Sequence, residues 1–372
     1  MLQVIMEPKL YKFDTCKEFA EGFSVGLGDL ILTNRYIYDP CFSRLGLNAQ
    51  VIFQEEYGSG EPTDIMTERM MKDAAKLSYK RIIAIGGGTI IDIAKAMSVA
   101  DGDESMDVLY NRMSDLTKRY ELIIIPTTCG TGSEVTNIAV FNRTRMGTKM
   151  GLVGPALYAD KAVLIPELLY TLPFHVFATS SIDALVHAVE SVLSPKATAY
   201  TKLFSYKAIE MIIRGYQKLR EEGREALTSL LDDFLTASNF AGIAFGTAGC
   251  GLVHAMAYPL GGECHIAHGE SNYALFIDVM KKYAALRKDG EMAVLNKMLS
   301  ELLGCEEASV YEELEALLNV IFARKPLREY GVTEDNLKSF SSSVIENQGR
   351  LLANAYVKVD RELVEQIYKE SY

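Results

Sequence analysis

Arg81-Ile-Ile-Ala-Ile-Gly-Gly-Gly-Thr-Ile-Ile-Asp-Ile-Ala-Lys-Ala-Met97 joins a short β-branched run to a helix-forming run through three consecutive glycines. The apolar residues 81–85 are typical of a strand that is buried on both faces, as in a parallel sheet. The glycines permit a sharp bend and a close approach of a ligand to the backbone, because they carry no Cβ. We therefore predict a strand, a tight turn and a helix whose N-terminus faces the place where a pyrophosphate would bind.

Other interpretations of this stretch stay open. Thr89 followed by Asp92 resembles a capping box with Asp in the place of Glu. The glycines also fit a plain strand-to-helix turn with no ligand. The run lacks the Gly-Lys-Ser/Thr of a P-loop, which disfavours nucleotide hydrolysis, and it is not a strict Gly-x-Gly-x-x-Gly.

The N-terminal half of the chain repeats this alternation of strands and helices. Glu121-Leu-Ile-Ile-Ile125 is a second buried strand and leads into Pro126-Thr-Thr-Cys-Gly-Thr-Gly-Ser-Glu134, which offers donors and acceptors to a ribose, a phosphate or a carboxamide. A turn satisfied internally is the alternative. Further strand-like runs cover 29–34, 49–53 and 162–165. We therefore predict a Rossmann-like parallel sheet that binds its ligand at the carboxyl ends of the strands.

Helical patterns dominate from about Pro173 to the end of the chain. They are clearest over 200–220, 224–240, 291–303 and 306–324. The predicted fold class is therefore α/β plus all-α. We expect a nucleotide-binding α/β domain over residues 1–170 and a helical domain over residues 171–372, each long enough to bury its own core.

The helical half begins with Thr179-Ser-Ser-Ile-Asp-Ala-Leu-Val-His-Ala-Val-Glu190, which we interpret as the first turns of a helix capped by Ser180 or Ser181. Asp183 and His187 are four residues apart and therefore share one face of that helix. A carboxylate beside an imidazole is half of a site for a divalent transition metal. A pair satisfied by hydrogen bonds is the alternative.

The remaining ligands of such a metal must come from elsewhere in the chain. The chain has five histidines, and three of them, His254, His265 and His268, fall in one glycine-rich segment. This cluster favours the metal site over a plain hydrogen-bonded pair and makes the helical domain the predicted metal-binding domain.

Composition excludes several classes of function. The net charge of −11 argues against nucleic acid as a partner, because phosphate contacts require clustered Lys and Arg. The six cysteines are scattered without a Cys-x-x-Cys, so neither a disulfide framework nor a zinc knuckle is indicated. The chain shows neither a signal peptide nor an apolar run of the roughly 18 residues that a membrane span needs. We therefore expect a cytoplasmic protein that acts on a small molecule.

Taken together, these motifs resemble those of the iron-dependent (group III) alcohol dehydrogenases, and the resemblance spans nearly the whole chain. The motifs are Gly86-Gly-Gly-Thr-x-x-Asp92, Pro126-Thr-Thr-x-Gly-Thr-Gly-Ser-Glu134, Asp183-Ala-x-x-His187, His254 and His268-Gly269. Within the family the chain is most similar to the branch that acts on 4-hydroxybutyrate. The stretches shared with that branch are Lys12-Phe-Asp-Thr15, Phe53-Gln-Glu-x-Tyr-Gly-x-Gly-Glu-Pro62, Ala241-Gly-Ile-Ala-Phe-Gly246, His265-x-x-His-Gly-Glu270 and Arg324-Lys-Pro-Leu-Arg-Glu-Tyr-Gly331.

The resemblance implies a dehydroquinate synthase-like pair of domains, with cofactor and metal in the cleft between them, and a homodimer. The residues that match the family's ligands to Fe²⁺, or sometimes Zn²⁺, are Asp183, His187, His254 and His268. The residues that match its nucleotide site are Gly87, Gly88, Thr89 and Asp92 in the pyrophosphate motif, Thr127 and Thr128 along the nucleotide, and Lys149, a lysine that reaches the cofactor.

Two positions depart from the family pattern. Tyr258 stands four residues after His254, where many members carry a further histidine thought to relay a proton. Asn34 stands where an acidic residue usually binds the adenosine ribose and rejects a 2′-phosphate. Because Asn34 is neutral and Arg35 follows it, the sequence predicts NAD as the preferred cofactor but excludes NADP less firmly.

The resemblance implies reversible hydride transfer between NAD(H) and a small ω-hydroxy acid, namely 4-hydroxybutyrate, with succinate semialdehyde as the product. The metal would act as a Lewis acid on the alcohol oxygen. His265 is the first candidate for holding the substrate carboxylate, and Tyr258 is the candidate for proton transfer. The alternatives are another primary alcohol or diol dehydrogenase (for butanol or 1,3-propanediol), a dehydroquinate synthase-like lyase, and a nucleotide-binding protein with a structural metal.

Overall fold

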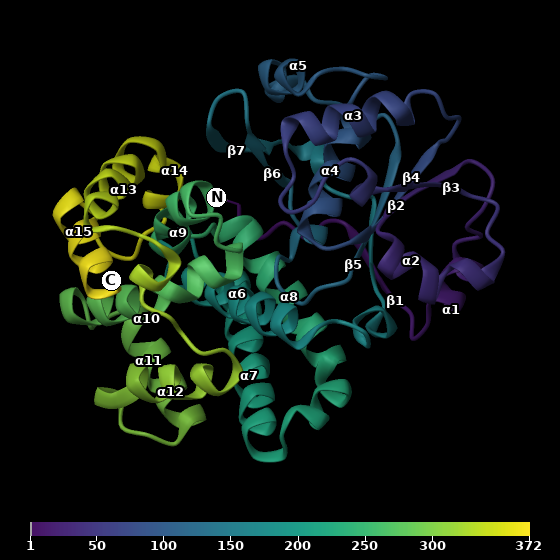
Figure 1. Cartoon of the computed structure of the whole chain (residues 1–372). Coiled ribbons are helices and arrows are strands. Elements are labelled where there is room, and N and C mark those ends of the chain that lie inside the picture. Colours follow the sequence, from purple (N-terminus) through teal and green to yellow (C-terminus); the bar gives the residue numbers. More distant parts are fainter. Residues whose placement is uncertain (1) are drawn as a thin grey trace. The chain divides into compact units, whose positions relative to one another are not determined.

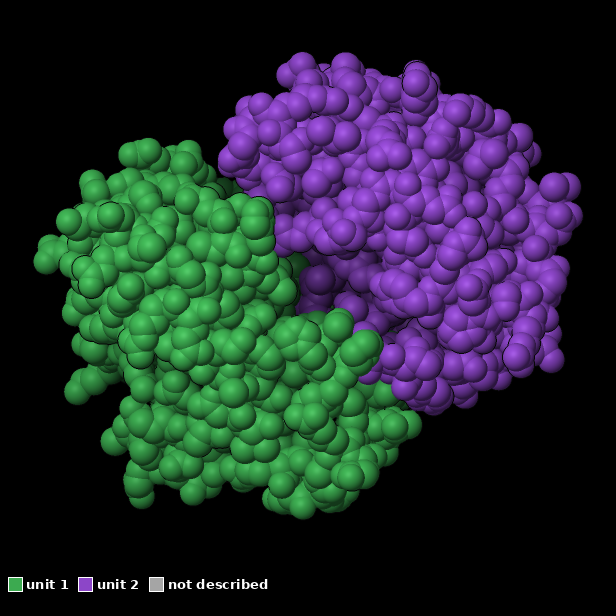
Figure 2. All heavy atoms as spheres, in the orientation of Figure 1, with its two compact units in different colours: residues 1–5, 173–372 green, residues 6–172 purple. Residues whose placement is uncertain are grey.

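The computed structural model describes residues 2–372 and divides into two compact units (Figures 1 and 2). One unit is residues 6–172, and the other is residues 173–372 joined by the N-terminal segment that ends at Ile5. This segment belongs with the helical unit because the Ile5 N–H donates to Thr247 Oγ1 at 3.1 Å and the Gln3 carbonyl accepts from Thr198 Oγ1 at 2.6 Å.

The unit 6–172 is built on a six-stranded parallel sheet with the order β1-β8-β5-β4-β2-β3, which confirms the predicted fold class (Figure 1). The strands are β1 (Lys9–Lys12), β2 (Asp29–Thr33), β3 (Gln50–Phe53), β4 (Arg81–Gly86), β5 (Glu121–Pro126) and β8 (Lys161–Leu164). Ile82, Ile83, Ala84 and Ile85 of β4 are all fully buried, as expected for a strand covered on both faces. The strands β5, β4 and β2 are neighbours, so the loops that follow them share one edge of the sheet.

Helices and a hairpin complete this unit. The helices are α1 (Cys16–Gly22), α2 (Arg35–Cys41), α3 (Asp64–Ala74), α4 (Gly88–Val99) and α5 (Met106–Asn111). The strands β6 (Ile138–Arg143) and β7 (Thr148–Val153) form a separate antiparallel pair that the sequence patterns did not predict.

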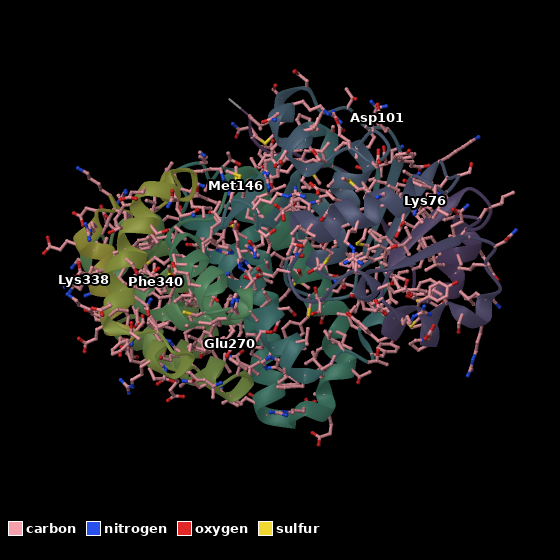
Figure 3. The ribbon with its side chains drawn as sticks, turned by 45° about the horizontal axis from the view of Figure 1, so that its top comes forward. Lys76, Asp101, Met146, Glu270, Lys338 and Phe340 are labelled. Carbon is pink, nitrogen blue, oxygen red and sulfur yellow. The ribbon has the colours of Figure 1, made fainter. Side chains whose placement is uncertain are left out.

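The unit that contains residues 173–372 is helical, as predicted. Its helices are α6 (Phe174–Leu193), α7 (Ala199–Glu222), α8 (Leu227–Ala248), α9 (Leu252–Glu263), α10 (His268–Leu286), α11 (Glu291–Leu303), α12 (Val310–Ile321), α13 (Glu334–Asn347), α14 (Gly349–Leu352) and α15 (Arg361–Glu370). The outer helices are amphipathic, as α13 illustrates: Phe340 is fully buried, whereas Lys338 is exposed (Figure 3).

The start predicted for α6 is wrong. The helix begins at Phe174, with Pro173 at the N-cap, so Ser180 and Ser181 lie in its interior. There the Ser180 hydroxyl donates to the Phe177 carbonyl at 3.2 Å, which satisfies it without ending the helix. By length and hydropathy α6 could cross a membrane, but 89% of its apolar window is buried inside the protein, as in the core helix of a globular protein.

Candidate active site

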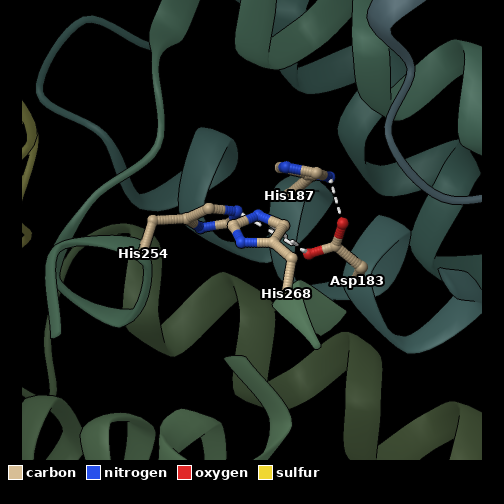
Figure 4. A group of neighbouring side chains, drawn as sticks. All are labelled: Asp183, His187, His254 and His268. Carbon is tan, nitrogen blue, oxygen red and sulfur yellow. Dashed lines mark ion pairs between the residues drawn. The ribbon is translucent and has the colours of Figure 1, made fainter. Parts of the chain in front are cut away.

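Four of the predicted ligands gather around one point in the helical unit. Asp183 and His187 lie one turn apart on α6, His254 lies near the start of α9, and His268 is the first residue of α10 (Figure 4). Asp183 Oδ1 is 3.8 Å from Nε2 of both His254 and His268, and Oδ2 is 3.9 Å from His187 Nδ1.

These separations suit a single ion. Donor atoms that each lie about 2.1 Å from a metal are at most about 4.2 Å apart. One ligand atom from each of the four side chains lies within 4.8 Å of all the others, so small side-chain movements bring every pair within that limit. Three imidazole nitrogens and one carboxylate oxygen are donors that Fe²⁺ and Zn²⁺ both accept.

The electrostatics of the group also favour a cation. Burial alone would raise the pKa of Asp183, but the imidazoles of His187, His268 and His254 and a hydrogen bond from Asn272 outweigh it, so the pKa is lowered. Asp183 is therefore a buried carboxylate held in its charged form, and such a group is stabilised by a bound ion. The side chain of His268 is 35% exposed, so the group is not sealed from solvent.

Asn272 belongs to this group, although we did not predict it. Its Nδ2 lies 2.7 Å from Asp183 Oδ1, 3.1 Å from His254 Nε2 and 3.3 Å from His268 Nε2. Its Oδ1 is buried and has no hydrogen-bond partner among the residues that the structure describes. The acceptor atoms of Asp183, His254 and His268 therefore all face the same amide nitrogen. Asn272 could have been predicted from the sequence, because it stands four residues after His268 and therefore on the same face of α10.

Glu190 is a second residue that we did not predict, and it orients His254. Its buried carboxylate accepts from His254 Nδ1 at 2.6 Å, from the Gly251 N–H at 3.0 Å and from the Val253 N–H at 2.6 Å. The bond to Nδ1 leaves Nε2 of the same ring facing Asp183. Cys250 also lies close to Glu190 and His254, and burial raises the pKa of its thiol well above the usual value.

We expect Glu190→Gln to weaken metal binding 10- to 100-fold, which is typical when the hydrogen-bond partner of a liganding histidine is lost. The amide is neutral, so its oxygen accepts from His254 Nδ1 more weakly than the carboxylate does. Competition with a chelator measures the metal dissociation constant. Glu270→Gln is the matched control, because Glu270 accepts a hydrogen bond from Tyr330 Oη at 2.9 Å and does not contact a predicted metal ligand. Equal dissociation constants for Glu190→Gln and the wild type would contradict this role.

Gly269 determines how closely α10 approaches α6. A Cβ at this position would meet the backbone carbonyl of Thr179, only 2.9 Å from its carbon and closer still to its oxygen. The two helices therefore touch backbone to backbone beside the ligands. This contact brings His268 to Asp183.

In the unit 6–172 the predicted nucleotide loops come together at the sheet edge. Ala84 of β4 pairs with Leu32 of β2 and with Ile124 of β5, so the three strands end at about the same level. Gly87 and the start of α4 therefore lie between the loops that follow β2 and β5. This is the edge at which open parallel sheets bind ligands.

The predicted capping box at Thr89 and Asp92 is wrong. Helix α4 begins at Gly88 with Gly87 at the N-cap, and among the described residues no side chain caps it. Thr89 Oγ1 donates instead to the Gly60 carbonyl at 3.0 Å, and Asp92 accepts from Ser133 Oγ at 3.0 Å and from the Val140 N–H at 2.8 Å. A first turn without a side-chain cap offers its N–H groups to an anion.

The glycine loop faces the threonine loop that follows β5. The Thr127 N–H donates to the Gly86 carbonyl at 3.1 Å, and a Cβ on Gly87 would lie 3.5 Å from the Thr128 methyl. A Cβ on Gly88 would lie 3.2 Å from the Thr131 methyl. Side chains at Gly87 and Gly88 would therefore narrow the space between the two loops, next to the free N–H groups at the start of α4.

We expect Gly88→Val to raise the dissociation constant of NADH at least ~10-fold, equivalent to ~1.4 kcal/mol, because the side chain would occupy the space where the phosphates approach. The change in NADH fluorescence on binding provides the titration, because the chain contains no tryptophan. Gly26→Val serves as the control, since a Cβ at Gly26 would have no atom within 4 Å. An unchanged affinity in Gly88→Val would move the nucleotide site elsewhere.

A buried lysine that we did not predict holds the threonine loop. Lys95 Nζ donates to Ser133 Oγ at 2.8 Å, to Thr136 Oγ1 at 3.1 Å and to the Ile138 carbonyl at 2.7 Å. Burial lowers the pKa of Lys95 to about 8 and raises that of Asp92 to about 6. Lys95 could have been noticed in the sequence, because it is a charged residue three positions after Asp92 in a helix that is mostly apolar.

The other predicted site residues lie in several places. Lys149 is on β7 and forms an ion pair with Glu61 at 2.6 Å, in the segment that also meets Thr89. Tyr258 is on α9, one turn after His254 and partly buried. His265 is exposed, has a φ of 55°, and does not belong to the group of four ligands. Asn34 is buried at the end of β2.

The sequence is similar to known alcohol dehydrogenases over both units. Residues 23–166 match the family model "Iron-containing alcohol dehydrogenase", and residues 177–372 match "Fe-containing alcohol dehydrogenase family, C-terminal". The 4-hydroxybutyrate dehydrogenase of Clostridium kluyveri is 47% identical over 367 residues, covering 99% of both chains. The long-chain-alcohol dehydrogenase 1 of Geobacillus thermodenitrificans is 34% identical over 355 residues, covering 90% of this chain and 88% of the relative.

Solved structures share the fold. A 1,3-propanediol oxidoreductase superposes with a TM-score of 0.85 at 21% identity and covers 100% of both chains. The sulfoacetaldehyde reductase of Bifidobacterium kashiwanohense in complex with NAD⁺ superposes with a TM-score of 0.84 at 20% identity, covering 100% of this chain and 98% of the other. The two family models together span most of the chain, and the sequence identity extends over its whole length. The chain is therefore a member of the iron-containing alcohol dehydrogenase family.

Proposed function

We propose that the protein is a metal- and NAD(H)-dependent oxidoreductase that interconverts 4-hydroxybutyrate and succinate semialdehyde. The observation that carries this proposal is the 47% identity over 99% of the chain to an enzyme named for that substrate. The group of Asp183, His187, His254 and His268 supports the metal dependence, because its donors and spacing fit one divalent ion.

We propose Fe²⁺ as the metal, with Zn²⁺ as the alternative that the same donors accept. NAD(H) would lie on Gly87, Gly88 and Thr89, along Thr127 and Thr128, and within reach of Lys149. Asp92 would contribute by holding Ser133 and β6 in place. The six cysteines are all free, which supports the cytoplasm as location. The edge strand β1 exposes Leu10 and Tyr11 and could pair with a second copy in a homodimer.

In the reaction, the alcohol carbon gives a hydride to NAD⁺ and its oxygen gives up a proton, so the products are the aldehyde, NADH and H⁺. When bound, the metal supplies a Lewis acid that lowers the pKa of the alcohol hydroxyl. The side chains of this protein have the other tasks. The His254–Glu190 pair keeps one donor atom fixed, and Tyr258 is the residue proposed to relay the proton.

The proposal is tested by the rates of NADH oxidation with succinate semialdehyde and with butyraldehyde. A group that binds the carboxylate is left unpaired by butyraldehyde, and a charge-assisted hydrogen bond contributes ~1.5–3 kcal/mol. We therefore expect kcat/KM to be roughly 10- to 150-fold higher for succinate semialdehyde. Equal values, or a preference for butyraldehyde or 3-hydroxypropanal, would leave only a general alcohol or diol dehydrogenase. NAD that is recycled and not consumed would instead indicate a lyase.

The partner of the substrate carboxylate is tested by His265→Ala. If His265 holds that carboxylate, the variant should slow succinate semialdehyde about 10-fold and leave butyraldehyde nearly unchanged. Lys325→Met is the comparison, because Lys325 is the nearby cation whose Nζ lies 3.9 Å from Glu270. A preserved substrate ratio in His265→Ala, with a reduced one in Lys325→Met, would transfer the role to the lysine.

A further inference from the structure

The carboxylate of Glu55 lies beside Asn34, the residue that follows β2 and that stands where the family pattern has an acidic residue. Glu55 follows β3, and its Oε2 accepts from Asn34 Nδ2 at 2.8 Å. Its Oε1 accepts from the backbone N–H of Arg35 at 2.7 Å. A residue of the short 3-10 helix Gln54–Glu56, directly after the outer strand β3, thus reaches the end of β2, the strand next to the glycine-loop strand β4.

This position corresponds to the ribose site of a dinucleotide-binding sheet. In such sheets an acidic side chain at the end of the strand beside the glycine loop accepts from the adenosine ribose hydroxyls and repels a 2′-phosphate. Here Asn34 stands at that strand end, but it is buried, and its amide also donates to Gln54 Oε1 at 2.9 Å. Asn34 is therefore a support for the neighbouring carboxylate.

The surroundings of Glu55 fit this use. The residue is exposed, so part of its carboxylate is accessible to a ligand. Burial alone would raise its pKa, but the Arg35 N–H and the Asn34 amide outweigh it and lower the pKa, so Glu55 is charged. The next segment, 58–60, links the surroundings of Glu55 to the start of α4. The Gly58 carbonyl accepts from Gln54 at 2.8 Å, and the Gly60 carbonyl accepts from Thr89 at 3.0 Å.

Arg35 is not free to attract the 2′-phosphate of NADP(H). Its guanidinium pairs with Glu56 Oε1 at 2.6 Å and lies 4.0 Å from the centre of the Phe53 ring. A cation held by a carboxylate and an aromatic face attracts a 2′-phosphate less than a free arginine does. Asn34 and Arg35 are therefore not the only side chains that bear on the choice between NAD and NADP, because Glu55 contacts both residues.

We propose that Glu55, held by Asn34, binds the adenosine ribose hydroxyls of NAD(H) and rejects the 2′-phosphate of NADP(H). The proposal rests on the proposed use of a nicotinamide dinucleotide by this unit. It assigns the cofactor preference to a residue of the stretch 53–62, for which the sequence alone gave no role. It predicts a stronger preference for NAD(H) than the neutral Asn34 alone suggests.

The test compares the dissociation constants of NADH and NADPH, measured by fluorescence titration of the metal-loaded enzyme. The wild type should bind NADH at least ~10-fold more tightly, the smallest effect expected of one charge-assisted hydrogen bond. Glu55→Gln should lower the NADPH/NADH ratio of dissociation constants by at least ~10-fold, chiefly by weakening NADH. Asn34→Ala should shift the ratio in the same direction, because it removes the support.

Two controls separate this role from others. Asp39→Asn removes a negative charge from α2 without touching Asn34 and should leave the ratio unchanged. If Glu55 only stabilises the start of α2, Glu55→Gln will lower the melting temperature and keep the ratio, and this result overturns the proposal. A wild type that binds neither NADH nor NADPH overturns the proposed function as well. A wild type that prefers NADH, with a Glu55→Gln variant of the same preference, overturns the inference alone.

Discussion

The His268→Ala variant should fold like the wild type, lose its bound metal and reduce succinate semialdehyde about 1000-fold more slowly. His268 is the first residue of α10 and partly exposed, so its removal costs little packing. It is also one of the three imidazoles that gather around Asp183, and a Lewis acid contributes several kcal/mol to such a reaction. About 4 kcal/mol corresponds to the stated factor. Circular dichroism checks the fold, metal content after dialysis checks the loss of the ion, and the rate of NADH oxidation checks the activity.

His175→Ala is the control for this variant, because His175 is exposed on α6 and its ring lies 5.3 Å from that of Phe322, away from the four ligands. It should keep both metal and rate. A His268→Ala protein with full metal content and full activity would exclude His268 as a ligand.

The Gly269→Ala variant should lose both stability and metal, although alanine is ordinarily the better helix former. Its methyl group would meet the backbone carbonyl of Thr179 and would lie 3.3 Å from Asp183 Cβ. Backbone atoms cannot move aside as side chains do, so α10 must shift away from α6. Overpacking of this kind costs ~1–3 kcal/mol. The same shift moves His268 away from Asp183, and we expect the metal dissociation constant to rise at least 10-fold.

Gly262→Ala is the matched control, because Gly262 is also helical and a Cβ there would have no atom within 4 Å. It should be neutral or slightly stabilising, as alanine is favoured over glycine in helices. Urea unfolding and chelator competition give the two quantities. A Gly269→Ala protein as stable and as tightly metal-bound as Gly262→Ala would show that the backbone contact does not hold the site together.

The parts of the fold that could be predicted are those in which the local order of apolar and polar residues shows which side chains are buried. Strands β4 and β5 are uninterrupted apolar runs because helices and loops cover both their faces. The four residues of β1 are all exposed, and the pair β6 and β7 mixes polar and apolar residues, so neither has such a pattern. The start of α6 was misplaced because serine inside a helix can bond to the preceding turn as readily as it can cap.

The same limit applies to the site. The pair of Asp183 and His187 is visible in the sequence because a helix places residues four apart on one face. The bond between Glu190 and His254 joins residues 64 positions apart, and that between Asn272 and Asp183 joins residues 89 apart. Only the packing of α6, α9 and α10 brings them together. Glu55 was overlooked for a related reason, since its contact with Asn34 joins neighbouring strands.

Removal and return of the metal is the most direct test of the claim that these four ligands support hydride transfer. The enzyme is stripped with a chelator, and NADH-dependent reduction of succinate semialdehyde is measured before and after one equivalent of Fe²⁺ or Zn²⁺ per chain is added. We predict that the rate falls about 1000-fold and returns with the metal. NADH binding and the circular dichroism spectrum should change little throughout. A metal-free enzyme that stays folded and keeps its full rate would contradict the account.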